Sequence, residues 1–238
     1  AFFCYLYQYI RKIVTINADK IIRRIKMQNV KTRRLVETGV MLAIGTVLSM
    51  IRLFALPFGG SVTVVSMLPI VLIAYRYGTK WGLFSGFVFG LLNMVTGFST
   101  VKAFFMPDEG YTLFKAILII LIDYIIAYTV LGFGGIFAKK FKKGSVSLCL
   151  GSIVALSLRF VAHFISGYIF FGSYAEWFFS QDTIKGFGET VLNNLSGTGL
   201  AAFYSLFYNA TYMIPEILIT AAVAFIIGSV PVISKRQV

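Results

Sequence analysis

The chain has few charges for its length and few of the residues that hold metals. Of its 238 residues 13% are charged, and it has one histidine and two cysteines. A soluble domain carries roughly 25% charged residues, so an ordinary soluble protein is excluded. A disordered chain is excluded as well, because disorder requires low hydrophobicity and 58% of this chain is apolar. Since no cluster of cysteine and histidine indicates a metal, we expect no cofactor.

Two catalytic motifs are missing from the sequence. It has no G-x-x-x-x-G-K-S/T phosphate loop and no H-E-x-x-H helix. The chain therefore cannot hydrolyse ATP by the usual route, and active transport by it would need an ion gradient or a partner. Cys4 and Cys149 lie far apart in apolar contexts, which indicates unpaired packing residues.

Long apolar blocks dominate what is present. They are about 15–25 residues long, the length that a helix needs to cross a bilayer, whereas a membrane β-barrel would alternate with period two. The pattern predicts an all-α membrane protein of six transmembrane helices, at about 35–54, 64–76, 81–98, 113–137, 146–171 and 203–230. The second is short and contains Pro69, so we expect neighbours to bury it and to compensate its interrupted hydrogen bonding.

The 22 basic and 9 acidic residues give a net charge of +13. In a soluble protein this would suggest nucleic acid, but basic residues also collect on the cytoplasmic side of membrane proteins. Seventeen basic residues fall before the first helix, after the second and fourth, and at the chain end, against three in the other connections. The positive-inside rule then predicts that both termini are cytoplasmic. Since the rule also accounts for the excess of basic residues, we expect no nucleic-acid partner.

The chain has three expected parts. Residues 1–32 form a basic N-terminal segment, residues 33–232 the six-helix domain, and residues 233–238 a cytoplasmic tail. Within the first part, residues 1–26 have the spacing of a basic amphipathic helix on the lipid surface. Alternatively, Met27 is the biological start and the preceding residues are not native. The sequence leaves both possibilities open.

Polar residues inside apolar helices are costly and are functional candidates by default. We expect a ligand role for Asp123, His163 and Asn209, and helix packing or ion pairing for Glu216, Arg159 and Asn93. A carboxylate, an imidazole and an amide beside aromatic rings would form a pocket for a flat, polar organic molecule that can be cationic. The aromatic residues next to this polar set are Tyr124, Phe171 and Tyr204.

Four segments resemble the thiamine-binding S components of energy-coupling factor (ECF) transporters, the ThiT/YuaJ family. They are GGSVTVVSMLPIVLIAYRYG (59–78), LIDYIIAYTVLGFGGIF (121–137), RFVAHFISGYIFFGSYA (159–175) and FYSLFYNATYMIPEIL (203–218). The resemblance implies the six-helix S-component fold in a bacterial plasma membrane. It implies a subunit without enzymatic activity that captures thiamine on the outer side. Its implied partners are a transmembrane scaffold subunit and two ATPase subunits.

The resemblance also assigns residues. The implied thiamine site comprises Asp123, Tyr124, His163, Phe171, Tyr204, Asn209 and, in the first external loop, Gly60, Ser61 and Thr63. Phe171 stands where the family usually has Trp, and Ser61 stands where some members have Glu. Gly39 and Ala43 correspond to the small residues that dock on the scaffold.

One segment departs from the family, and two other functions compete with the first. Residues 175–203 are longer than the family pattern and are expected on the outer side, as a lid or a determinant of specificity. An S component for another vitamin, or for a precursor such as hydroxymethylpyrimidine, is one alternative. An intramembrane enzyme with Asp123 and His163 as acid–base pair is the other, although no nucleophile or metal motif accompanies them.

Overall fold

The computed structural model describes residues 29–56, 60–106 and 111–234. The chain divides into two compact units, residues 1–40 and 41–238. In the first unit, residues 29–40 are helical, and Arg33 Nε donates a hydrogen bond of 2.7 Å to Glu37 Oε1 one turn away. The predicted amphipathic helix, the question of Met27, and residues 235–238 of the tail lie outside the described residues.

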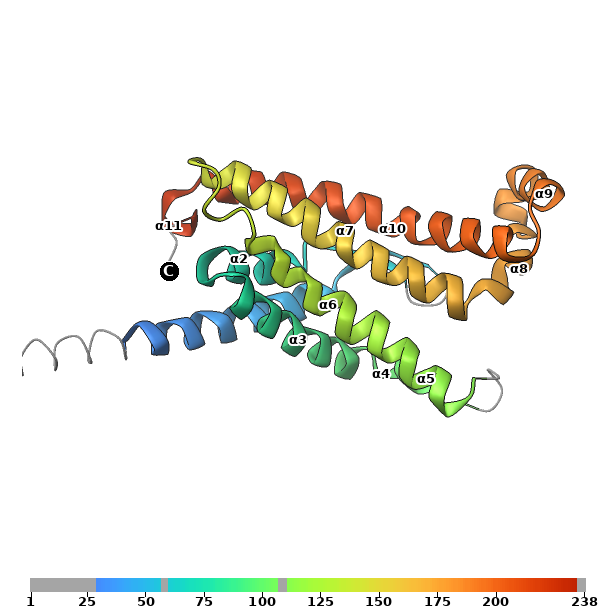
Figure 1. The fold of residues 1–238 in the computed structure, drawn as a ribbon, viewed down its shortest axis with the longest axis horizontal. Coiled ribbons are helices and arrows are strands. Elements are labelled where there is room, and N and C mark those ends of the chain that lie inside the picture. Colours follow the sequence, from blue (N-terminus) through green and yellow to red (C-terminus); the bar gives the residue numbers. More distant parts are fainter. Residues whose placement is uncertain (1–28, 57–59, 107–110, 235–238) are drawn as a thin grey trace, which may run out of the picture. The chain divides into compact units, whose positions relative to one another are not determined.

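The second unit begins with the remainder of the first helix, which ends at residue 50. A strand pair follows, and then helices separated by short turns (Figure 1). The strands are β1 (Arg52–Ala55) and β2 (Ser61–Thr63). The helices are α2 (Leu68–Tyr77), α3 (Thr79–Thr96), α4 (Phe98–Ala103), α5 (Leu113–Ile120), α6 (Ala127–Thr129), α7 (Gly144–Phe170), α8 (Ala175–Phe179), α9 (Lys185–Asn194), α10 (Gly197–Gly228) and α11 (Pro231–Ser234).

The predicted helices are all present, with different ends. The first stops at residue 50 rather than 54, because Arg52–Ala55 leave the helix and pair as β1. The sixth begins six residues earlier than predicted, at Gly197 in place of residue 203. Pro69 lies in the first turn of α2, where no backbone N–H is required. It therefore leaves the hydrogen bonding of the helix intact, and the expected interruption is wrong. The prediction that this helix is buried is confirmed.

The strand pair is a correction to the all-α prediction. β1 and β2 pair antiparallel, with Phe54 opposite Val62 and a register irregularity between Arg52 and Phe54. The chain is therefore mostly helical, with a small two-stranded hairpin between the first helix and α2. Residues 54 and 62 meet through backbone hydrogen bonds between segments that alone would be too short to be stable.

The helix over residues 113–135 changes its winding in the middle. After α5 the chain forms a π-helical turn, η3 (Leu121–Ile126), then α6, and then a 3₁₀ segment, η4 (Val130–Gly135). A glycine face of α3 packs on it: a Cβ on Gly86 would meet the backbone oxygen of Tyr128, and one on Gly90 that of Tyr124. Asp123 and Tyr124 thus lie on a π-helical turn, a distortion that is often found at functional sites.

The longest helices, α7 and α10, run antiparallel side by side (Figure 1). Around α2 the core is fully buried, with Ile70, Val71 and Ala74 at 0% exposure. In the described part of the chain, three helices are long and apolar enough to cross a membrane, Leu113–Gly135, Gly144–Phe170 and Gly197–Gly228. The predicted number of six spans is thus supported in part and otherwise stays a prediction.

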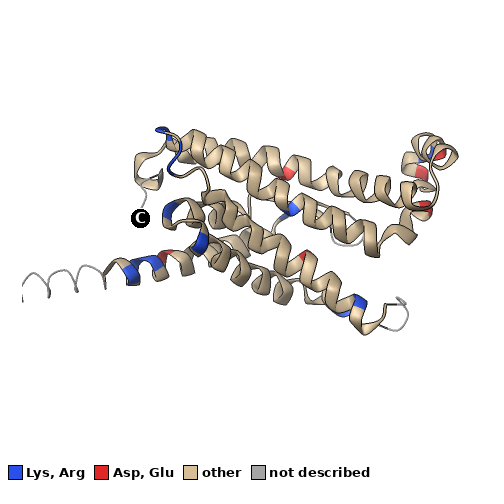
Figure 2. Cartoon of the chain, viewed as in Figure 1, with Lys and Arg blue, Asp and Glu red and all other residues tan. Residues whose placement is uncertain are grey.

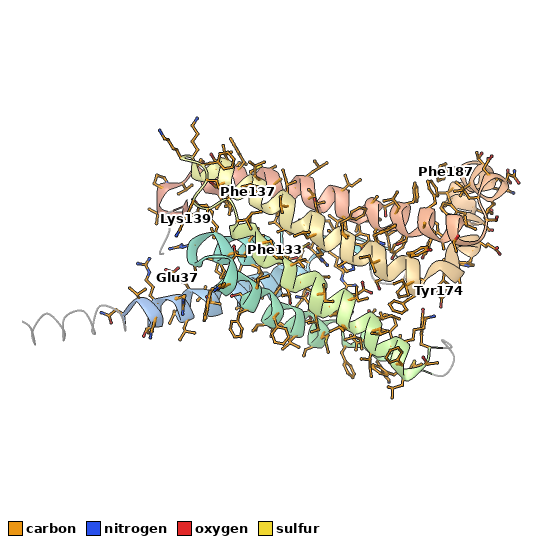
Figure 3. The ribbon with its side chains drawn as sticks, in the orientation of Figure 1. Glu37, Phe133, Phe137, Lys139, Tyr174 and Phe187 are labelled. Carbon is orange, nitrogen blue, oxygen red and sulfur yellow. The ribbon has the colours of Figure 1, made fainter. Side chains whose placement is uncertain are left out.

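The two ends of the second unit differ in charge (Figure 2). At one end, basic residues gather at the α2–α3 junction and in the segment before α7. The second group is Lys139, Lys140, Lys142 and Lys143. The opposite end carries residues 175–203, the segment that we predicted to be an insertion, with three acidic residues and Lys185. Figure 3 shows Tyr174 and Phe187 at this second end, and Phe137 and Lys139 at the first.

The insertion folds as α8 and α9 against the start of α10. Phe178 makes edge contacts with Tyr204 and Tyr208 at 5.3 and 6.0 Å between ring centroids. Phe187 contacts Phe203 and Phe207 at 6.3 and 5.1 Å. Aromatic pairs at such separations attract one another beyond simple area burial, so the insertion is a packed element of the unit.

Candidate functional site

A cavity of about 170 Å³ lies between the hairpin, α3, the π-helical turn, α7 and α10. Every residue that the sequence assigned to the ligand lines it: Gly60, Ser61, Thr63, Asp123, Tyr124, His163, Phe171, Tyr204 and Asn209. These residues come from four separate stretches of the chain. The fold therefore brings together the whole set that was predicted to be adjacent.

Asp123 is the centre of a hydrogen-bond network on the cavity wall. Its Oδ1 lies 2.8 Å from His163 Nδ1, and its Oδ2 accepts a hydrogen bond of 2.6 Å from Ser166 Oγ. The exposed fraction of the side chain is 19% for Asp123 and 11% for His163. Each carboxylate oxygen has more than one acceptor position, so Asp123 is fixed in place and can still face a ligand.

His163 lines the cavity and carries a ring nitrogen without a partner among the described residues. A carboxylate only accepts hydrogen bonds, so the hydrogen between the two side chains resides on His163 Nδ1. In the neutral form of the ring, Nε2 is then the unprotonated nitrogen. It is buried and has no hydrogen-bond partner within the described residues. A buried acceptor without a partner costs free energy, so this nitrogen is suited to a ligand that brings a donor.

Asn209 is held by its own helix, α10, and by α7. Its Nδ2 donates to the Ser205 carbonyl oxygen at 2.8 Å and to that of His163 at 3.3 Å. Its Oδ1 accepts a hydrogen bond of 2.5 Å from Tyr212 OH. Because both amide hydrogens are occupied, only the second lone pair of Oδ1 remains for a ligand. His163 on α7 and Asn209 on α10 therefore lie beside each other.

Aromatic rings form further walls. Phe171 lies 6.2 Å from Phe104 and 6.1 Å from Tyr111, measured between ring centroids. Tyr204 and Tyr208 also line the cavity and pack 5.8 Å apart. Such rings offer flat faces for stacking and negative potential for a cation.

The hairpin supplies the remaining wall. Gly60 N donates to Tyr208 OH at 3.2 Å, and a Cβ at Gly60 would stand 2.8 Å from the Tyr212 ring. Only glycine allows the backbone to approach these tyrosines so closely. Thr63 is bound to Glu216 of α10 through its backbone N–H and its hydroxyl, at 2.6 and 2.8 Å.

Sequence reasoning missed several lining residues. Arg159 and Asn93 were expected to serve helix packing or ion pairing, and both line the cavity. Arg159 lies 4.5 Å from the Tyr128 ring centroid and donates to Tyr128 OH at 3.3 Å. Arg52 of β1 was not considered, because the hairpin was not predicted. The position of Arg159 four residues before His163 was the available signal, since such residues share a helix face.

Gly39 and Ala43 do not line the cavity. They are four residues apart on the helix over residues 29–50 and so share a face. Ala43 is exposed.

Known proteins resemble this chain over most of its length. Residues 35–180 match the family described as thiamine transporter protein (Thia_YuaJ). The thiamine transporter ThiT of Bacillus subtilis (strain 168) is 33% identical over 201 residues, which are 80% of this chain and 87% of that protein. The thiamine transporter ThiT of Lacticaseibacillus paracasei is 26% identical over 165 residues, 66% of this chain and 72% of that one.

A solved structure of ThiT from Listeria monocytogenes has a TM-score of 0.61 and covers 86% of this chain and 98% of its own. At 22% identity this likeness supports the fold alone. The family match extends across the hairpin, the π-helical turn and α7, which carry six of the nine predicted cavity residues. This chain therefore belongs to the thiamine transporter protein family, multi-pass membrane proteins of the bacterial plasma membrane.

Proposed function

We propose that this chain is the thiamine-binding S component of an ECF-type importer, and that thiamine occupies the cavity described above. The observation that carries the proposal is the meeting of nine predicted residues, from four separate stretches of sequence, in one cavity. The family and its named relatives are thiamine transporters, which supports the choice of ligand.

Asp123 offers a counter-charge for a cation. Asp123 and Glu216 are carboxylates, and Arg159, which interacts electrostatically with Glu216, is the basic side chain among these three. Arg52 and Arg159 also line the cavity, so a bound cation would pair with Asp123 and lie away from the two guanidinium groups. Thiamine carries a permanent positive charge on its thiazolium ring. A charge in a poorly solvated site needs an opposite partner, and Asp123 is the carboxylate that lines the cavity in the described part of the chain.

The free acceptors suit the other ring of thiamine. His163 Nε2 and the second lone pair of Asn209 Oδ1 both require a donor. The amino group of the pyrimidine ring is such a donor. Phe171, Tyr124 and Tyr204 supply ring faces for the two flat halves of the ligand.

The arrangement in the membrane follows from the charges. The lysine-rich end of the second unit faces the cytoplasm by the positive-inside rule, with six spans and both termini inside. The 175–203 insertion then lies outside. The sequence has no phosphate loop, so in this proposal ATP is hydrolysed by two ATPase partners. A scaffold subunit couples these partners to the chain, and Gly39 and Ala43 form the face that docks on the scaffold.

The test is calorimetric titration of the purified protein in detergent. Thiamine should bind with one ligand per chain and remain chemically unchanged, whereas hydroxymethylpyrimidine, which lacks the thiazolium, should bind more weakly. The wild type should bind des-amino thiamine more weakly than thiamine. His163→Ala should bind the des-amino analogue almost as well as the wild type does, because the lost donor and the lost acceptor belong to one interaction. Tighter binding of hydroxymethylpyrimidine would assign the site to the precursor.

A further inference from the structure

The hairpin is attached to α10 by a buried carboxylate outside the cavity. Glu216 accepts from Thr63 N at 2.6 Å and from Thr63 Oγ1 at 2.8 Å, one bond on each carboxylate oxygen. Since the single hydroxyl hydrogen of Thr63 goes to Glu216, Ser66 Oγ donates to Thr63 Oγ1 at 2.7 Å. The three side chains are 1%, 8% and 2% exposed for Glu216, Thr63 and Ser66.

This chain of hydrogen bonds begins at the cavity wall and ends at a residue outside the cavity. Thr63 and Ser66 line the cavity, whereas Glu216 does not. Glu216 is therefore not part of the cavity wall, and its hydrogen bonds reach that wall through Thr63 of the hairpin. A buried carboxylate with two donors is stable where it lies, and removing it would leave the Thr63 N–H buried without a partner.

A second attachment lies nearby. Gly60 N donates to Tyr208 OH, two helical turns from Glu216 on α10. Both attachments join the Gly60–Thr63 stretch to the same helix, and Gly60, Ser61 and Thr63 all line the cavity. Without the Glu216 contact, the Tyr208 bond would hold the hairpin at one end only.

We infer that Glu216 is a positioning residue, which fixes the Ser61–Thr63 strand on α10 and thereby slows escape of the ligand past this wall. The inference deepens the proposed function, on which it rests for the identity of the ligand. It assigns to Glu216 a role in ligand retention, in addition to the packing role that the sequence suggested.

The test compares Glu216→Met with Glu216→Gln. Methionine fills a similar volume and accepts no comparable hydrogen bond. Glutamine keeps both bonds, because its oxygen accepts from Thr63 N while its amide donates to Thr63 Oγ1, whose hydrogen turns to Ser66 Oγ. Thr220→Val is the matched control: Thr220 is one turn further along α10, fully buried, outside the cavity, and its Oγ1 has no hydrogen-bond partner in the described residues.

Two measurements are made on each purified variant. One is amide hydrogen exchange of residues 60–66 without ligand, and the other is the dissociation rate of labelled thiamine. We expect Glu216→Met to exchange faster and to release thiamine at least about tenfold faster, as loss of hydrogen bonds to a charged group implies. Glu216→Gln and Thr220→Val should stay near the wild type in both.

Each outcome decides the inference. Unchanged exchange in Glu216→Met overturns it, and faster exchange without faster release overturns the link to the ligand. If Glu216→Met does not fold, Thr63→Val should show the faster hairpin exchange and Thr63→Ser should not. If the wild type binds no thiamine, the proposed function fails, while the exchange of the ligand-free protein still shows whether Glu216 holds the strand.

Discussion

At the scale of single residues, Asp123 would supply the counter-charge for thiamine in the proposed site. It is the carboxylate among the lining residues, and its two neighbours, His163 and Ser166, hold it without neutralising it. The same hydrogen bond fixes the tautomer of His163 and so makes Nε2 an acceptor. One carboxylate therefore sets both the electrostatic and the hydrogen-bonding preference of the site.

Replacing Asp123 by Asn should weaken thiamine binding. The change keeps the size of the side chain and removes its charge, so we expect a loss of about 1–3 kcal/mol, the scale of a hydrogen bond to a charged group. Calorimetric titration measures it. Glu189→Gln is the control, because it removes one exposed carboxylate on α9, away from the cavity. Equal thiamine affinity in Asp123→Asn and the wild type would remove Asp123 from the site.

Among the elements, the contact of α3 with the π-helical turn places Asp123 and Tyr124. The glycine face of α3 lets the two backbones touch, because a side chain at Gly86 or Gly90 would occupy the space of a carbonyl oxygen. Small residues have this role in membrane helices generally. The cavity wall at Asp123 thus depends on glycines behind it.

Gly90→Ala should lower both stability and affinity. The new methyl group would meet the Tyr124 oxygen and push the π-helical turn toward the cavity, and such overpacking costs about 1–3 kcal/mol. Thermal unfolding in detergent and thiamine titration report the two effects. Gly186→Ala in α9, where a Cβ meets nothing within 4 Å, should leave the melting temperature unchanged or raise it. A Gly90→Ala protein as stable as Gly186→Ala would contradict the packing argument.

At the scale of the whole molecule, the separation of charge between the two ends predicts the orientation. In a variant without Cys4 and Cys149, a membrane-impermeant maleimide should label Glu189→Cys in intact cells. Lys142→Cys should be labelled only after the cells are opened, since both positions are exposed and differ in the end of the unit that they occupy. The opposite labelling pattern would invert the proposed topology.

In the proposed importer, uptake also requires the scaffold and ATPase partners, and the proposed docking face separates binding from uptake. Gly39→Trp and Ala43→Trp should abolish thiamine uptake in cells with the full transporter, while the purified proteins still bind thiamine. Val161→Trp, at an exposed position of α7, should preserve both. Loss of binding in the docking variants would mean that this face is packed inside the protein.

Several features were determined by the sequence itself. The apolar blocks predicted every long helix, because the length and hydrophobicity needed to cross a bilayer are local properties of the chain. The cost of burying a polar group likewise singled out Asp123, His163 and Asn209, which the fold places around one cavity. The family resemblance added the hairpin residues Gly60, Ser61 and Thr63, which no local property of the chain distinguishes.

Other features were decided only by tertiary structure. The strand pair forms because Arg52–Ala55 find Ser61–Thr63, a pairing that neither segment encodes alone. Arg159 lines the cavity, and Glu216 binds Thr63 of the hairpin. Both positions depend on contacts with distant segments, so the helical environment of each residue alone did not distinguish them. Hydrophobic periodicity reports how deeply a residue is buried, whereas the partner of a buried charge depends on which elements the fold brings beside it.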